Sequence, residues 1–141
     1  MRVVVDASVA AKWVVAEAHS EAAAALLDLE ALYAPDHWQA EAVNVLWSKQ
    51  QFGDLTVAEA EARLDLLLRA PIQAVPIATL MPGAFAIAVG NGVTVYDALY
   101  LALARDLGIP FVTADARLLR KVTDAALRPL LRWIGDRPEA G

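Results

Sequence analysis

The sequence predicts an α/β domain in which helices cover both faces of a mainly parallel sheet. Val3 to Val5 are all β-branched, as expected for a short strand that is buried on both faces. Strand-like and helix-like segments then alternate to the end of the chain. Residues 94–108 read as a helix with no polar face, which is typical of a helix packed inside a domain. Together these observations predict a single three-layer α/β/α domain over residues 1–141.

Local signals in the first half of the chain define four helices and a strand. Asp6-Ala7-Ser8 ends the first strand and begins a helix that runs to about Val15. Ser20 is expected to cap a second helix, and Thr56 with Glu59 matches the capping box of a fourth. The expected bounds of the helices are Glu21 to Glu30, Asp36 to Phe52 and Thr56 to Arg69, and a brief apolar segment, Leu32 to Ala34, stops at Pro35.

The second half repeats the alternation and ends on an edge strand. Gly108 ends the apolar helix, and Pro129 places the last strand at the edge of the sheet because proline cannot donate a ladder hydrogen bond. A polar tail, residues 135–141, is expected to fray. The expected elements are Ile72 to Ile77 (strand), Leu80 to Val89 (helix), 94–108 (helix), Ile109 to Thr113 (strand), Ala116 to Val122 (helix) and Leu127 to Ile134 (strand).

Composition limits the class of protein. Apolar residues make up 58% of the chain and the mean hydropathy is +0.43, yet no apolar run reaches the ~18 residues of a membrane span. There are no cysteines, which excludes disulfides and thiolate metal sites. MRVVVDAS contains too short an apolar run for a signal peptide, so we expect a cytoplasmic protein that does not associate with a membrane.

The apolar surplus predicts a subunit interface, and we expect a homodimer. The same residues could instead fill the core. The residues on which this expectation rests are Leu64, Leu67 and Leu68 on one helix, with Trp13, Trp38 and Trp47 elsewhere.

Charge is distributed unevenly along the chain. The formal net charge is −5, but residues 1–104 carry −7 and residues 105–141 carry +2. Arg117, Arg120 and Lys121 are the densest part of the basic segment. Such a cluster is often only a solvated helix face. It becomes a candidate phosphate-binding surface if a neighbouring site handles nucleic acid.

Four carboxylates stand where a site is expected in a parallel α/β sheet. Asp6 and Asp115 follow strands, Asp97 lies in the first turn of the apolar helix, and Glu41 is the only acid between His37 and Lys49. Ligands bind beyond the carboxyl ends of parallel strands and near helix N-termini. Asp6 or Asp115 could instead simply cap a helix, Asp97 could simply favour a helix N-terminus, and Glu41 could belong to a polar stripe on the surface. All four acids together favour a site, in which they should converge within a few ångströms of one cation position.

Clustered carboxylates repel one another unless a cation holds them. Hard oxygen ligands without sulfur suit Mg²⁺ or Mn²⁺. The sequence contains no glycine-rich phosphate loop and no nucleophile elbow. These features favour metal-dependent phosphodiester hydrolysis.

At these residues the chain resembles the PIN-domain ribonucleases, and among them the VapC toxins of toxin–antitoxin pairs. The matching segments occur in the family's order: VVVDASVAAKW (3–13), HWQAEAVNVLW (37–47), TVYDALYLALA (94–104) and FVTADARLL (111–119). The resemblance implies a PIN-like fold and an Mg²⁺- or Mn²⁺-dependent endoribonuclease that acts on RNA. It assigns catalysis and metal binding to Asp6, Glu41, Asp97 and Asp115.

The resemblance also implies supporting residues and partners. Ser8 and Thr113 match supporting hydroxyl positions, and Asn44, on the polar stripe of Glu41, is expected to support the site as well. Arg117, Arg120 and Lys121 are expected to contact the RNA backbone. The implied partner proteins are a second copy of the chain and a small VapB-like antitoxin. The alternative function is a catalytically inert or regulatory Mg²⁺-binding interaction module.

Overall fold

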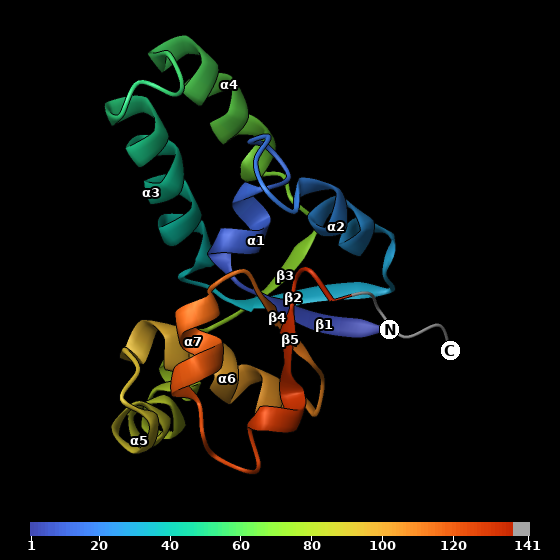
Figure 1. Cartoon of the computed structure of the whole chain (residues 1–141), viewed down its shortest axis with the longest axis vertical. Coiled ribbons are helices and arrows are strands. Elements are labelled where there is room, and N and C mark those ends of the chain that lie inside the picture. The colour runs from blue at the N-terminus through green and yellow to red at the C-terminus, as the bar shows by residue number, and fades with distance from the viewer. Residues whose placement is uncertain (137–141) are drawn as a thin grey trace.

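The computed structural model describes residues 1–136, and the last five residues of the expected tail, 137–141, lie outside that part of the chain. Five strands and seven α-helices alternate in it (Figure 1). The strands are β1 (Arg2–Val5), β2 (Ala31–Pro35), β3 (Ile72–Val75), β4 (Phe111–Thr113) and β5 (Leu131–Trp133). The helices are α1 (Ala7–Ala11), α2 (Ser20–Ala25), α3 (Trp38–Gln51), α4 (Val57–Leu67), α5 (Met81–Asn91), α6 (Val95–Leu107) and α7 (Ala116–Lys121).

The strands form one sheet in the order β3-β2-β1-β4-β5, and every neighbouring pair is parallel. The register places Val4 of β1 opposite Tyr33 of β2 on one side and opposite Phe111 of β4 on the other. The predicted parallel α/β fold is therefore confirmed. Because all strands point the same way, their carboxyl ends meet at one edge of the sheet.

Helices cover both faces of the sheet. Val4 and Phe111 face the core that contains the buried side chains of α6, while Val3 and Val5 face a second core with Val9 of α1. Figure 1 shows α5, α6 and α7 on one side of the sheet and α1 and α2 on the other. In the same view α3 and α4 pack on each other and extend away from the sheet as an arm.

The capping signals fix several helix ends where expected. The capping box is present, since Thr56 Oγ1 accepts from Glu59 N and Glu59 Oε1 accepts from Thr56 N. Gly108 adopts a φ of 65° after the last turn of α6, a left-handed conformation that glycine enters without steric cost.

Several sequence-based predictions of local structure were wrong. The second helix ends at Ala25 instead of the expected Glu30. The first helix ends at Ala11, and Ser20 is the first residue of α2 instead of its cap; the Ser20 hydroxyl accepts from Glu17 N. The last strand is an edge strand, but Pro129 lies before it in a 3₁₀ turn, Arg128–Leu130. Two further 3₁₀ turns cover Leu26–Asp28 and Ile77–Thr79.

Part of the apolar surplus lies in the core. Leu67 and Trp38 are buried, so neither can form the dimer interface expected of them, and Leu64 and Trp13 pack partly against the core. Leu68 and Trp47 are exposed. Within residues 1–136 no single helix has the length and apolar character needed to cross a membrane; α5 and α6 would reach that length only together, and they are bent by 114°.

Candidate active site

Asp6 lies at the carboxyl end of β1 and its carboxylate is held from three directions. Its Oδ1 accepts from the Ser8 hydroxyl at 2.6 Å and from Val9 N at 3.0 Å, and its Oδ2 accepts from the Thr113 hydroxyl at 2.5 Å. Asp6 therefore caps α1 and is also fixed to the neighbouring strand β4. Burial, with a smaller contribution from the charge of Asp97, raises the pKa of Asp6 to about 6. These three hydrogen bonds act in the opposite direction.

Thr113 links Asp6 to Asp115. Its fully buried hydroxyl donates to Asp6 and accepts from Asp115 N at 3.0 Å. Asp115 in turn caps α7, because its Oδ1 accepts from Arg117 N at 2.9 Å and from Leu118 N at 3.3 Å. One hydroxyl therefore sets the relative positions of two acids.

Asp97 is half-buried in the first turn of α6, which Thr94 caps by accepting from Asp97 N at 3.2 Å. Burial raises the pKa of Asp97, and the charges of Asp115 and Glu41 raise it further. Thr94 and the positive charge of Lys121 act in the opposite direction. Asp97 thus feels three acids, Asp115, Glu41 and Asp6, across the carboxyl edge.

Glu41 reaches this edge from α3 and is held through one oxygen. Its Oε1 accepts from the Tyr100 hydroxyl at 2.7 Å and lies 3.2 Å from His37 Nε2. Burial raises the pKa of Tyr100 far above its ordinary value, and the nearby charge of Glu41 adds to the effect, so the hydroxyl stays protonated and donates. Burial lowers the pKa of His37, but the hydrogen bond and charge of Glu41 outweigh it and raise the pKa overall.

The remaining supporting residues divide into those that reach the site and one that does not. Ser8 and Thr113 both donate to Asp6. Asn44 is exposed, and within residues 1–136 its side chain makes no hydrogen bond to another residue. The sequence-based interpretation missed Tyr100 and His37. Two signals could have identified them: Tyr100 is a polar group one helical turn after Asp97, and His37 lies four residues before Glu41.

The four predicted acids lie at one edge of the sheet, but the expected convergence of their carboxylates on one cation position is not seen in the part of the chain that the structure describes. In the described residues no three His, Asp or Glu side chains lie close enough together to hold a metal ion. The donors nevertheless fit a hard divalent cation, because Asp6 and Asp97 are buried or half-buried acids whose charges repel. A cation placed among them would relieve that repulsion.

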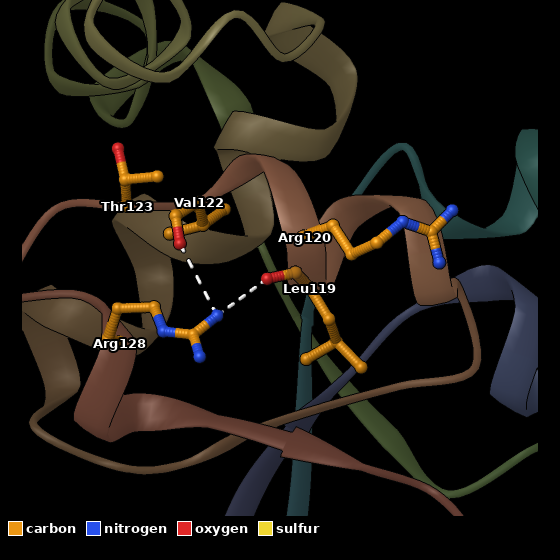
Figure 2. Close-up of a pocket in the computed structure, with 5 residues that line it drawn as sticks. All are labelled: Leu119, Arg120, Val122, Thr123 and Arg128. Atoms are coloured by element: carbon orange, nitrogen blue, oxygen red, sulfur yellow. Dashed lines mark hydrogen bonds between the residues drawn. The ribbon is translucent and has the colours of Figure 1, made fainter.

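The basic residues of α7 differ in what they face. The charge of Lys121 acts on Asp97, so this end of α7 lies near the acids. A hollow of about 570 Å³ lies beside the same helix, and the residues that line it, Leu119, Arg120, Val122, Thr123 and Arg128, are drawn in Figure 2. Arg128 Nη1 donates to the carbonyl oxygens of Leu119 at 2.6 Å and Val122 at 3.5 Å, so Arg128 fastens the end of α7. Arg120 extends away from Arg128 (Figure 2).

The chain is similar in sequence to known proteins. The PIN domain family profile matches residues 3–124. The chain is 36% identical over 124 residues to Ribonuclease VapC3 of Pyrobaculum aerophilum, an alignment that covers 86% of this chain and 95% of that protein.

Solved structures show the same fold. The crystal structure of PAE2754 from Pyrobaculum aerophilum superposes with a TM-score of 0.68 at 25% identity, covering 95% of this chain and 90% of that one. VapBC2 from Rickettsia felis, solved bound to a DNA fragment from its promoter, gives a TM-score of 0.62 at 12% identity and covers 94% and 98%.

Proposed function

The chain belongs to the PIN-domain family, and from that premise we propose that it is a metal-dependent endoribonuclease that hydrolyses phosphodiester bonds in RNA. The observation that carries the proposal is the buried and rigidly held Asp6 beside Asp97, Glu41 and Asp115 at one sheet edge. The name of the relative from Pyrobaculum aerophilum, a ribonuclease, supports RNA as the substrate.

Asp6, Glu41, Asp97 and Asp115 would hold Mg²⁺ or Mn²⁺. When bound, such an ion would supply positive charge against the phosphodiester and its attacking water. Ser8 and Thr113 keep the Asp6 carboxylate in one orientation, so little reorganisation is needed when substrate arrives. Arg117, Arg120 and Lys121 would contact the RNA backbone, since α7 begins at the acidic edge.

The direct test is cleavage of RNA by the purified protein with and without metal. We expect cleavage to stop on addition of EDTA and to return with excess Mg²⁺ or Mn²⁺. Asp6→Asn, purified in the same way, controls for contaminating ribonucleases and should be inactive. A wild-type protein that binds Mn²⁺ but does not cut RNA would favour the alternative, an inert or regulatory Mg²⁺-binding module.

The biological role we propose is that of the toxin in a type II toxin–antitoxin pair, with a VapB-like antitoxin as inhibitor. This rests on the similarity to VapC proteins and on the solved VapBC2 assembly of Rickettsia felis. Expression of the chain alone should arrest growth of a bacterial host, and co-expression of the antitoxin should restore it. Growth arrest that persists in the Asp6→Asn variant would contradict a nuclease-based toxicity.

A further inference from the structure

Tyr100 is a buried residue with a polar hydroxyl, and the charges of two site acids, Glu41 and Asp6, act on it. It is 2% exposed on α6, and its ring stacks on Phe111 of β4 with centroids 5.5 Å apart at an angle of 12°. This packing leaves the ring little freedom to turn. Its hydroxyl is therefore a fixed donor, and it points at Glu41 Oε1 on a different helix, 2.7 Å away.

His37 contacts the same oxygen of Glu41. Its Nε2 lies 3.2 Å from Glu41 Oε1 and 3.1 Å from the carbonyl oxygen of Tyr96. Both neighbours are acceptors, so Nε2 must carry the proton. The other ring nitrogen, Nδ1, is buried and has no hydrogen-bond partner among the described residues. The imidazole is thus oriented by its contacts to Glu41 and α6, and the ring centroids of His37 and Tyr100 lie 5.0 Å apart.

Both contacts converge on a single carboxylate oxygen. Glu41 Oε1 receives the Tyr100 hydroxyl and lies within hydrogen-bonding distance of His37, whereas Oε2 makes no hydrogen bond within residues 1–136. Two of the other site acids are fixed by hydroxyl or backbone donors: Asp6 by Ser8, Val9 and Thr113, and Asp115 by the backbone of α7. Glu41 differs because its anchors are aromatic side chains contributed by two helices.

We propose that Tyr100 and His37 are positioning residues that hold Glu41 through Oε1 and leave Oε2 as the oxygen presented to a divalent cation. This inference rests on the proposed metal-dependent function. It assigns neither residue a direct contact with metal or RNA: both act through Glu41. Partners that orient a metal ligand typically change metal affinity by ~10–100-fold when removed.

The test measures Mn²⁺ affinity of the intact protein by calorimetry in the absence of RNA. Tyr100→Phe removes only the hydroxyl and keeps the ring that stacks on Phe111, and we expect it to weaken Mn²⁺ binding about tenfold. Tyr33→Phe is the matched control, because the Tyr33 hydroxyl of β2 makes no hydrogen bond in residues 1–136, and it should bind Mn²⁺ as the wild type does. For His37, the phenylalanine variant should weaken binding, whereas His37→Gln, which keeps an N–H donor, should restore most of it.

A double-mutant cycle separates positioning from a general structural effect. In a Glu41→Gln background, Tyr100→Phe should cause no further loss of Mn²⁺ affinity, because the carboxylate through which it acts is gone. The inference is overturned if Tyr100→Phe binds Mn²⁺ like the wild type, or if it weakens binding equally with and without Glu41. It is also overturned if the wild-type protein binds no Mn²⁺.

The positioning role of Tyr100 and the proposed nuclease activity can fail separately. If the wild type cuts RNA in a metal-dependent way and Tyr100→Phe binds Mn²⁺ normally, the positioning role is lost and the nuclease stands. If the cycle behaves as expected but the wild type never cuts RNA, the positioning role stands and the nuclease is lost.

Discussion

Burial makes the negative charge of Asp6 costly, and hydrogen bonds only partly offset that cost. The side chain is 8% exposed, and its pKa is raised to about 6 although two hydroxyls and one backbone N–H donate to it. A group whose pKa is higher in the folded chain than its ordinary value of 3.8 binds more protons when folded. Its contribution therefore favours the folded state at low pH and is lost as the pH rises.

The first prediction follows from this linkage. The metal-free protein should lose about 2–3 kcal/mol of unfolding free energy through Asp6 between about pH 4 and pH 7, at ~1.4 kcal/mol per pKa unit. Denaturant unfolding of wild type and Asp6→Asn across this range measures it. The difference in stability between the two proteins should shift in favour of Asp6→Asn as the pH rises, and a difference that does not vary with pH would contradict the prediction.

A second prediction concerns Asp97, whose pKa is raised by burial and by the charges of Asp115 and Glu41. Asp97→Asn should abolish RNA cleavage and raise the melting temperature of the metal-free protein by removing that repulsion. The gain must exceed the ~0.3–1 kcal/mol that a negative charge contributes at a helix N-terminus. Cleavage assays and thermal melts measure the two effects. The control is Asp106→Asn, which changes an exposed acid on the same helix. Full activity in a folded Asp97→Asn protein would show that the acid is only a helix-end group.

Among individual residues, the sequence pointed to the acids and to the hydroxyls of Ser8 and Thr113 that hold Asp6, but not to the residues that hold Glu41. Asp6 and Asp115 follow strands and Asp97 begins a helix, so topology alone brings them to one edge. The hydrogen bond from Tyr100 to Glu41 joins residues 59 positions apart. It depends on where Glu41, near the start of α3, lies relative to α6, and no local pattern in the sequence encodes that.

The helix α7 combines a carboxylate at its start with cations along its length. Asp115 caps it, and Arg117, Arg120 and Lys121 follow within six residues. The guanidinium of Arg128 donates hydrogen bonds to the carbonyl oxygens of Leu119 and Val122, so its side chain is fixed. We therefore do not count Arg128 among the residues that reach out to bind RNA. The exposed cations Arg117 and Lys121 lie one turn apart, and the charge of Lys121 reaches Asp97.

The third prediction is that Arg117→Ala with Lys121→Ala raises the apparent KM for RNA much more than it lowers kcat. Phosphate contacts position the strand without reading bases, so the loss should be similar across sequences and the salt dependence of binding should fall. Binding isotherms at several salt concentrations measure this. Arg63→Ala on α4 with Arg69→Ala just after it removes the same amount of charge far from α7 in the sequence and should have little effect. Unchanged affinity and salt slope in the first variant would return these cations to the role of a solvated helix face.

Element boundaries could be predicted where a single local interaction sets them. The capping box of Thr56 and Glu59 and the stop at Gly108 are such cases, and both appear in the structure. The prediction that Ser20 caps a helix was wrong because its hydroxyl forms hydrogen bonds with the preceding loop. His19 occupies the cap position instead, at a φ of 65°. The prediction that Pro129 lies in the last strand was wrong because the chain makes a 3₁₀ turn there before it enters the sheet.

Over the whole molecule, exposed apolar side chains gather on two separate sets of elements. The arm of α3 and α4, with the residues that adjoin the two helices, has charged residues nearby and exposes Trp47, Phe52, Val57, Leu66 and Leu68. Helix α5 instead exposes Met81, Phe85 and Val89, which are spaced four residues apart and therefore form one stripe. The segment Met81–Asn91 contains no charged residue. Depletion of charge around apolar side chains is the signature of an interface core.

The last prediction is that the protein is a homodimer that packs through α5, in place of the buried Leu67 and Trp38 considered from the sequence. A two-fold axis would bring the same stripe on two copies together. A stable interface needs about 800 Å² from each partner, so the exposed Val95 and Tyr96 that follow α5 in the chain should also contribute.

Sedimentation at micromolar concentration should show a dimer for the wild type and a monomer for Phe85→Glu with Val89→Glu. Trp47→Glu with Leu68→Glu places the same two charges on the arm and should leave the dimer intact. A wild-type monomer at micromolar concentration and above would remove the dimer, whereas dissociation by the arm variant alone would move the interface to α3 and α4.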